Sequence, residues 1–275
     1  MTQVIRLIAV FLVTLLALMV ARLLVAGWPE LNLHFITSPP KALDAGGGVG
    51  PQLFNSLYIL VLSLLFTAPL GLAAGIYMAE LAPPGRLTSA LSVATETLAT
   101  LPSIVVGLFG LLVFVEITHW SFTRLGGALA LTVINLPYAV RVTEDAVRAL
   151  PDSLREGSLA VGATRWQTIR RVLVPAALPS LITGLILVSG RAFGEAAALL
   201  YTAGQSALRG PISLDPFVPG ETLAVHLFIY RSDASVPDVN LIADGAAAVL
   251  LITVLAFNVI ARVLGRYAVR RITAT

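Results

Sequence analysis

Two charged residues, Arg191 and Glu195, stand about halfway along an otherwise apolar stretch. A charge at that depth of a bilayer costs at least about 2.5 kcal/mol on insertion scales, so such residues usually have a function. Four residues apart, they would share one face of a helix. A guanidinium offers a planar fork of donors that suits an oxyanion, and a carboxylate can hold it in place. A structural ion pair between two helices is the alternative, and the residues alone leave both open.

A polar, basic stretch, residues 152–175, comes directly before this apolar segment. Gly162 lies six residues after Glu156, and Pro175 lies thirteen residues after Gly162. A glycine permits a sharp turn between two short helices, and a proline sets a stiff joint to the next segment. The stretch is therefore expected to form short helices that turn at Gly162. An interfacial amphipathic helix whose arginines lie on lipid headgroups is the alternative to a contact with another protein.

The composition indicates an integral membrane protein, because 57% of the 275 residues are hydrophobic and only 12% are charged. The single lysine, Lys41, is not part of a Gly-Lys-Ser/Thr motif, which excludes ATP binding by a phosphate-binding loop. The chain has no Cys, and its three His lie far apart, so we expect no metal, no cofactor and no catalytic site. The excess of arginine fits loops beside a membrane better than nucleic acid.

The apolar blocks predict an all-α protein with six transmembrane helices in one domain, residues 1–275. The third block contains Glu96 and is interrupted at Pro102 and Ser103, so that it either lines a path or packs as a kink against a neighbour. Residues 223–230 are apolar, and the sequence does not decide whether they re-enter the membrane. The expected spans are 7–27, 53–79, 92–115, 127–146, 178–200 and 245–263.

Basic residues predict the orientation of the chain in the membrane. Six spans put both termini on one side, together with residues 152–175. That side carries twelve of the 18 Lys and Arg residues and the opposite side four. Both termini and residues 152–175 are therefore expected in the cytoplasm.

Residues 152–175 resemble the cytoplasmic EAA signature of ABC importer permeases. The spacing of Glu156, Gly162 and Pro175 matches, with Gly157-Ser158 in place of two alanines and Val174 in place of leucine. Further runs resemble the A-type permease subunits of phosphate-specific importers (PstA-like), namely Gly47-Gly48-Val49-Gly50-Pro51, Pro69-Leu70-Gly71, residues 97–107 and residues 191–204.

The resemblance implies the type I permease fold of ABC importers, with an EAA coupling helix that docks on the ATPase. The coupling residues it implies are Glu156, Ala160, Gly162, Ala163 and Pro175. It also implies a role in transport for Arg191 and Glu195. Together with Ser103 and Glu96 of the interrupted third block, these residues make up the expected substrate path. Gly190, Gly194 and Ala198 would form a small-residue stripe facing the second permease subunit.

The implied assembly lies in the bacterial inner membrane. It would contain a second, C-type permease subunit, two ATPase subunits that bind and hydrolyse ATP, and a periplasmic phosphate-binding protein. The expected function is import of inorganic phosphate, with no enzymatic activity in this chain. Sulfate and molybdate permeases resemble residues 191–195 and are the nearest alternatives. An ion-coupled transporter or membrane enzyme without an ATPase partner is the alternative from another class.

Overall fold

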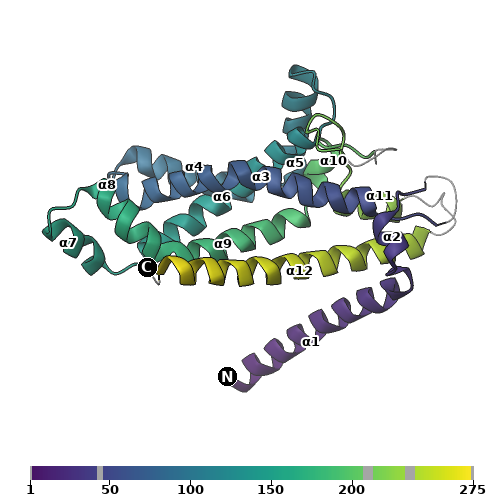
Figure 1. Cartoon of the computed structure of the whole chain (residues 1–275), viewed down its shortest axis with the longest axis horizontal. Coiled ribbons are helices and arrows are strands. Elements are labelled where there is room, and N and C mark those ends of the chain that lie inside the picture. The colour runs from purple at the N-terminus through teal and green to yellow at the C-terminus, as the bar shows by residue number, and fades with distance from the viewer. Residues whose placement is uncertain (1, 42–45, 207–212, 233–238, 274–275) are drawn as a thin grey trace.

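The computed structural model describes residues 2–41, 46–206, 213–232 and 239–273, which form helices, turns and loops without a β-strand. Among them, five helices are long and apolar enough to cross a membrane, and a bent pair adds a sixth if it counts as one span. The all-α membrane fold predicted from the apolar blocks is therefore confirmed (Figure 1).

The elements are α1 (Thr2–Gly27), η1 (Trp28–Glu30), α2 (Leu33–Thr37), α3 (Gly50–Ile76), η2 (Tyr77–Leu81), α4 (Arg86–Thr100), α5 (Ser103–Gly110), η3 (Leu111–Ile117), α6 (Arg124–Arg148), α7 (Asp152–Ala160), α8 (Arg165–Thr168), η4 (Ile169–Leu173), α9 (Val174–Phe193), α10 (Ala197–Leu200), α11 (Leu223–Ser232) and α12 (Val239–Thr273).

The centre of the bundle is the pair α3 and α6, which pack closely along their length. A Cβ on Gly71 would lie 2.5 Å from the Cβ of Ala139, and one on Gly75 would lie 2.5 Å from the Cβ of Thr143. Small residues at these positions let the two backbones approach. The helix α6 is consequently the most enclosed of the spans and provides the frame on which the others are placed.

The third span is not straight, because α4 and α5 meet at an angle of 96°. Pro102 has no backbone N–H and disfavours helical geometry at the residue before it, and Leu101 is accordingly extended, with φ −62° and ψ 133°. The expected interruption within residues 92–115 is therefore a sharp bend between two helices. The bend faces α6 and α10, which both pack against α5.

The fifth span differs more from the expectation. The segments α8, η4 and α9 run on from one another as a single apolar helix of 29 residues, Arg165–Phe193. No joint separates the basic stretch from the span at Pro175. The π-helical turn η4 directly precedes α9 and accommodates the missing N–H of that proline. The helix ends at Phe193, before the end of the expected range 178–200.

The last turns of α12 and the short helix α7 lie toward one end of the molecule, and α2 and α11 lie toward the other, while α1 slants away from the bundle (Figure 1). The outermost helix, α1, packs on α12, where a Cβ on Gly27 would lie 2.4 Å from the carbonyl oxygen of Asp244. The helix α12 extends to Thr273, well past the expected end at residue 263. Its last turns are basic, so the apolar pattern of the sequence did not include them.

Candidate functional site

The stretch that resembles the EAA signature forms two short helices, α7 and α8, joined by a tight turn, and residues 152–168 are called the EAA element below. Gly162 has φ +86°, a left-handed conformation that side-chain-bearing residues rarely adopt. No atom lies within 4 Å of a Cβ built there, so the backbone conformation and not lack of space favours glycine. Thr164 then begins α8 with a capping box, in which its hydroxyl accepts from the N–H of Gln167 at 3.3 Å.

This element is anchored to the bundle by Arg155, which sequence reasoning did not single out. Its guanidinium donates to Glu80 of η2 at 2.6 and 2.8 Å, and to Asp152 at 2.8 Å. It also donates to the carbonyl of Val147 at the end of α6, at 3.0 Å. The hydrogen bonds to Glu80 raise the pKa of Arg155 above its ordinary value, so the charge is permanent. A second link joins Ser158 of α7 and Thr168 of α8, whose hydroxyls are 2.9 Å apart.

The outer surface of the same element is exposed. Leu159, Val161 and Trp166 are 46%, 84% and 62% exposed, and they stand beside the exposed residues Glu156 and Ala160. Large apolar side chains exposed in a group mark an interaction site more often than scattered ones do. Ala163 and Pro175 are partly buried behind this surface. Glu156, Ala160 and Gly162 thus share one face of the molecule, whereas Pro175 belongs to the long helix.

The two intramembrane charges, Arg191 and Glu195, do not pair with each other. No ion pair joins them among the described residues, although an i, i+4 helical spacing would bring them together. The reason is that α9 ends at Phe193, so Glu195 lies in a non-helical break. There its Oε1 accepts from the backbone N–H of Ala198 at 3.3 Å and caps α10. The expectation that Glu195 holds Arg191 in place is therefore wrong for this structure.

Arg191 is held by an aromatic ring. Its Cζ lies 3.9 Å from the centroid of the Tyr138 ring on α6. The hydroxyl of Tyr138 donates to the carbonyl of Ala99, in the last turn of α4, at 2.7 Å. The arginine therefore sits where α9, α6 and the bend between α4 and α5 come together. Sequence reasoning missed Tyr138, which lies far from Arg191 along the chain and belongs to a different helix.

The other two candidates for the substrate path lie on the bent pair. Ser103 is the first residue of α5, directly after the bend, and is partly buried. Glu96 is exposed on α4, one turn before Ala99, and has no ion-pair partner among the described residues. The structure therefore places both on the element that Tyr138 links to Arg191, and it shows no direct contact of either with the arginine.

The expected small-residue stripe does not exist as one face. Gly190 faces α12, where a Cβ would lie 3.3 Å from the side chain of Asn258. Gly194 is exposed in the break after α9, and Ala198 is buried on α10 against Gly107. The stripe required a continuous helix through all three positions, and the break removes that continuity. At least two of the three positions serve contacts within this chain.

A buried polar cluster at the opposite end of the bundle was not foreseen either. Glu221 accepts from Gln52 at 2.8 Å, and Nδ1 of His226 lies 3.2 Å from Oε1 of Glu221. His226 belongs to α11, whose first turn is enclosed between α3 and α12. The apolar run 223–230 is thus packed in its first half against protein. Metal binding by three or more His, Cys, Asp or Glu is not supported anywhere in the described part of the chain.

Comparison with known proteins agrees with this architecture. Residues 71–274 match the family described as binding-protein-dependent transport system inner membrane component. The chain is 50% identical to a probable ABC transporter permease protein, YqgI, of Bacillus subtilis (strain 168), with 92% of this chain and 89% of that protein aligned. It is 32% identical to the phosphate transport system permease protein PstA 1 of Mycobacterium tuberculosis (strain CDC 1551 / Oshkosh), over 90% of this chain and 78% of that protein.

Solved structures share the fold. A bacterial alginate ABC transporter aligns with a TM-score of 0.69 at 17% identity, covering 98% of this chain and 94% of that one. The MetNI methionine ABC transporter in an inward-facing conformation aligns with a TM-score of 0.61 at 20% identity, covering 80% of this chain and 94% of that one. At such identities the likeness concerns the fold alone. The family match covers most of the sequence, and the chain therefore belongs to the binding-protein-dependent transport system inner membrane components, the permease subunits of ABC importers.

Proposed function

We propose that this permease passes inorganic phosphate into the cytoplasm, driven by ATP hydrolysis in a separate ATPase. The observation that carries the proposal is the state of Arg191. Its guanidinium is oriented by the Tyr138 ring, and no carboxylate among the described residues forms an ion pair with it. An oriented cation without a counter-ion at membrane depth favours the binding of an anion in transit.

Similarity to phosphate permeases supports phosphate as the transported anion. Several phosphate transport system permease proteins align at 31–34% identity, whereas the name of the 50% identical relative specifies no substrate. Glu195 adds a chemical reason, since only its Oε1 receives the N–H of Ala198. The remaining carboxylate oxygen would accept a hydrogen bond from a protonated phosphate oxygen. Sulfate carries no such proton at neutral pH, so Glu195 would favour phosphate over sulfate.

The proposed assembly assigns each partner to an exposed part of the chain. One of the two ATPase subunits would dock on the exposed face of α7 and α8, through Glu156, Ala160 and the turn at Gly162. A C-type permease subunit would cover the side on which Arg191, Glu96 and the bend at Ser103 lie. A periplasmic phosphate-binding protein would sit at the end that carries α2 and α11. Both chain termini would then face the cytoplasm.

The test is ATP-driven uptake of labelled phosphate, sulfate and molybdate by the assembled transporter in proteoliposomes. Arg191→Gln should lower phosphate uptake about 10- to 100-fold, the range expected for loss of a charge-assisted contact. Arg22→Gln, which changes an arginine in the outermost helix α1, is the matched control and should retain uptake. Glu195→Gln should reduce the preference for phosphate over sulfate.

Two results would contradict the proposal. Full phosphate uptake by an assembled Arg191→Gln transporter would show that the arginine does not contribute to the substrate path. Uptake of sulfate or molybdate but not of phosphate by the unmodified transporter would assign the permease to one of the alternative oxyanions.

A further inference from the structure

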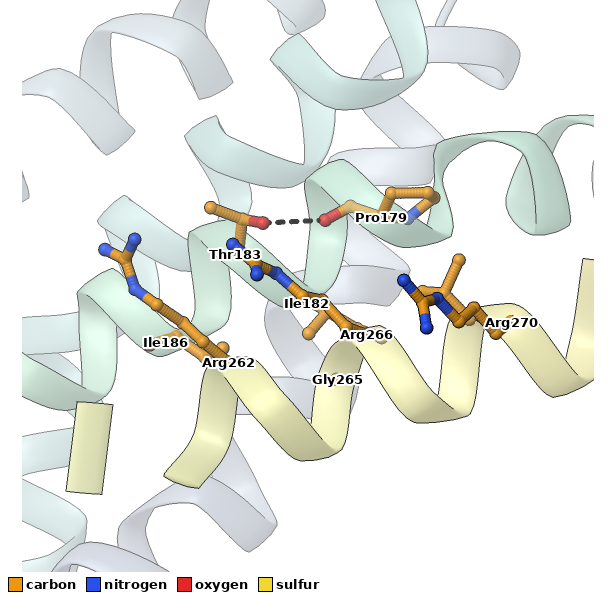
Figure 2. A pocket seen from close by; sticks show the side chains of 9 residues that line it. Pro179, Ile182, Thr183, Ile186, Arg262, Gly265, Arg266 and Arg270 are labelled. Carbon is orange, nitrogen blue, oxygen red and sulfur yellow. Dashed lines mark hydrogen bonds between the residues drawn. The ribbon is translucent and has the colours of Figure 1, made fainter. Parts of the chain in front are cut away.

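A cleft of about 350 Å³ lies between α9 and α12, toward the end of the molecule that carries the C-terminus (Figure 2). Its apolar wall comes from α9, where Pro179, Ile182 and Ile186 follow one another along the helix. The two helices touch at its floor, since a Cβ on Gly265 would lie 2.5 Å from Cγ2 of Ile182. The cleft is therefore a groove between two spanning helices with an apolar base.

Three arginines, Arg262, Arg266 and Arg270, line the α12 side of this cleft. They recur every four residues and so lie on one face of the helix, over about 12 Å at 1.5 Å per residue. Their side chains extend from α12 across toward α9 (Figure 2). No described residue forms a hydrogen bond or ion pair with these guanidiniums, and no described residue that lines the cleft is acidic. Three positive charges thus stand over an apolar groove, with no counter-ion in the part of the chain that the structure describes.

The remaining polar group in the cleft is already used. The hydroxyl of Thr183 donates to the carbonyl of Pro179 at 2.9 Å. The donors available to a ligand are therefore the guanidiniums, whose planar forks match phosphate oxygens in a bidentate manner. A ligand that satisfies the whole cleft needs a phosphate for the arginines and an apolar chain for the isoleucines.

We propose that this cleft binds one anionic phospholipid, with its phosphate on Arg262, Arg266 and Arg270 and an acyl chain along Ile182 and Ile186. The position supports this occupant, because α9 and α12 are both long enough to cross a membrane and the arginines lie in the last turns of the α12 span and directly after it. Basic pockets between spanning helices near the membrane surface are where anionic headgroups bind. Free phosphate would use the arginines and leave the apolar wall without a role. The bound lipid would join α12 to the helix that continues into the EAA element.

The test is native mass spectrometry of the detergent-purified protein, together with any transporter subunits that remain bound, titrated with individual lipids. Phosphatidylglycerol should occupy one site at least about tenfold more tightly than phosphatidylcholine. Arg262→Gln with Arg266→Gln should weaken phosphatidylglycerol binding about 30-fold, at the strength typical of two basic side chains near anionic headgroups. Arg6→Gln with Arg86→Gln is the matched control, since both arginines are exposed and outside the cleft, and should change the affinity less than twofold.

A second variant keeps the test decisive if the double arginine variant fails to assemble. Thr183→Glu places a carboxylate against the arginines and should abolish the same site. The proposal is overturned if the two lipids bind alike, or if the control variant loses as much affinity as the cleft variant. It is also overturned if inorganic phosphate displaces phosphatidylglycerol at equal concentration, which would make free phosphate the ligand.

Discussion

At the scale of single residues, the way Arg191 is held decides what it can bind. A carboxylate partner would occupy guanidinium N–H donors and neutralise the charge. The face of the Tyr138 ring, 3.9 Å from Cζ, orients the guanidinium plane and leaves those donors free. Because the tyrosine is tied to Ala99 by its hydroxyl, the orientation of the arginine also depends on the bend between α4 and α5. A change in that bend would move the cation.

Substitution of Tyr138 tests this dependence. Tyr138→Leu removes the ring, and we expect phosphate uptake to fall about 2- to 30-fold, the range of a cation–π contact. Tyr138→Phe keeps the ring but loses the hydrogen bond to Ala99, so its loss should be smaller. The measurement is the initial uptake rate at several phosphate concentrations. Equal rates for Tyr138→Leu and the unmodified transporter would show that the ring does not position the arginine.

The sequence singles out Arg191 and Glu195 as candidates, but it does not predict their contacts. Arg191 and Glu195 stand out because charges in an apolar block are rare. Their mutual contact was predicted from helical spacing, and it fails because the helix ends between them at Phe193. Nothing in the sequence around Tyr138 indicates a special role, since aromatic residues are common in apolar helices. Its role arises only when α6 packs beside α9.

At the scale of elements, the sequence likewise predicted one feature of the EAA element correctly and missed others. The turn at Gly162 was predicted from the residue type, and the structure confirms it with φ +86°. The stiff joint at Pro175 was wrong, because the π-helical turn before it lets the helix continue. The ion pair between Arg155 and Glu80 could not be predicted from the sequence, since Glu80 lies at the end of a different span.

Two glycines in this element provide a matched pair of variants. Gly162→Ala forces a side chain into a left-handed backbone, at a cost of about 1–2 kcal/mol, and should weaken binding of the ATPase subunits about 5- to 30-fold. Gly157→Ala lies within α7 and has open space around its Cβ, so alanine there should keep or improve binding by favouring the helix. Co-purification at graded ATPase concentrations measures both. Equal loss for the two variants would show that the turn conformation is not what the ATPase requires.

The contact between Arg155 and Glu80 should couple the EAA element to the bundle. The two side chains are only 20% and 11% exposed, so a double-mutant cycle with alanine should give a coupling of about 1–3 kcal/mol in thermal unfolding of the protein. The exposed pair Arg141 and Asp145, at 58% and 62%, is the control and should give less than about 0.5 kcal/mol. Arg155→Ala should also leave ATP hydrolysis running while uptake falls. Unchanged uptake by the Arg155→Ala variant would show that this ion pair is not needed to couple ATP hydrolysis to transport.

At the scale of the whole molecule, one helix connects the proposed docking surface for the ATPase with Arg191. It runs without interruption from Arg165, beside the exposed surface of the EAA element, to Phe193, two residues beyond Arg191. Its 29 residues span about 43 Å at 1.5 Å per residue, enough to cross the hydrocarbon core. Under the proposed function, a displacement at the docking surface would reach the arginine along this one helix. The apolar blocks predicted a bundle, but this continuity depends on local backbone geometry that hydropathy does not report.

Orientation is the property of the whole molecule that the distribution of charge predicts. The chain contains no cysteine, so single cysteines can be introduced and labelled without a background. Val161 is 84% exposed at the turn after α7, and Leu33 is 77% exposed in α2 at the opposite end. With twelve basic residues on one side and four on the other, Val161→Cys should react with a membrane-impermeant maleimide only after the cells are opened, and Leu33→Cys should react in intact cells once the outer layers are permeable. The reverse pattern would place the EAA element outside, where no ATPase could reach it, and would refute the ATP-driven mechanism together with the orientation.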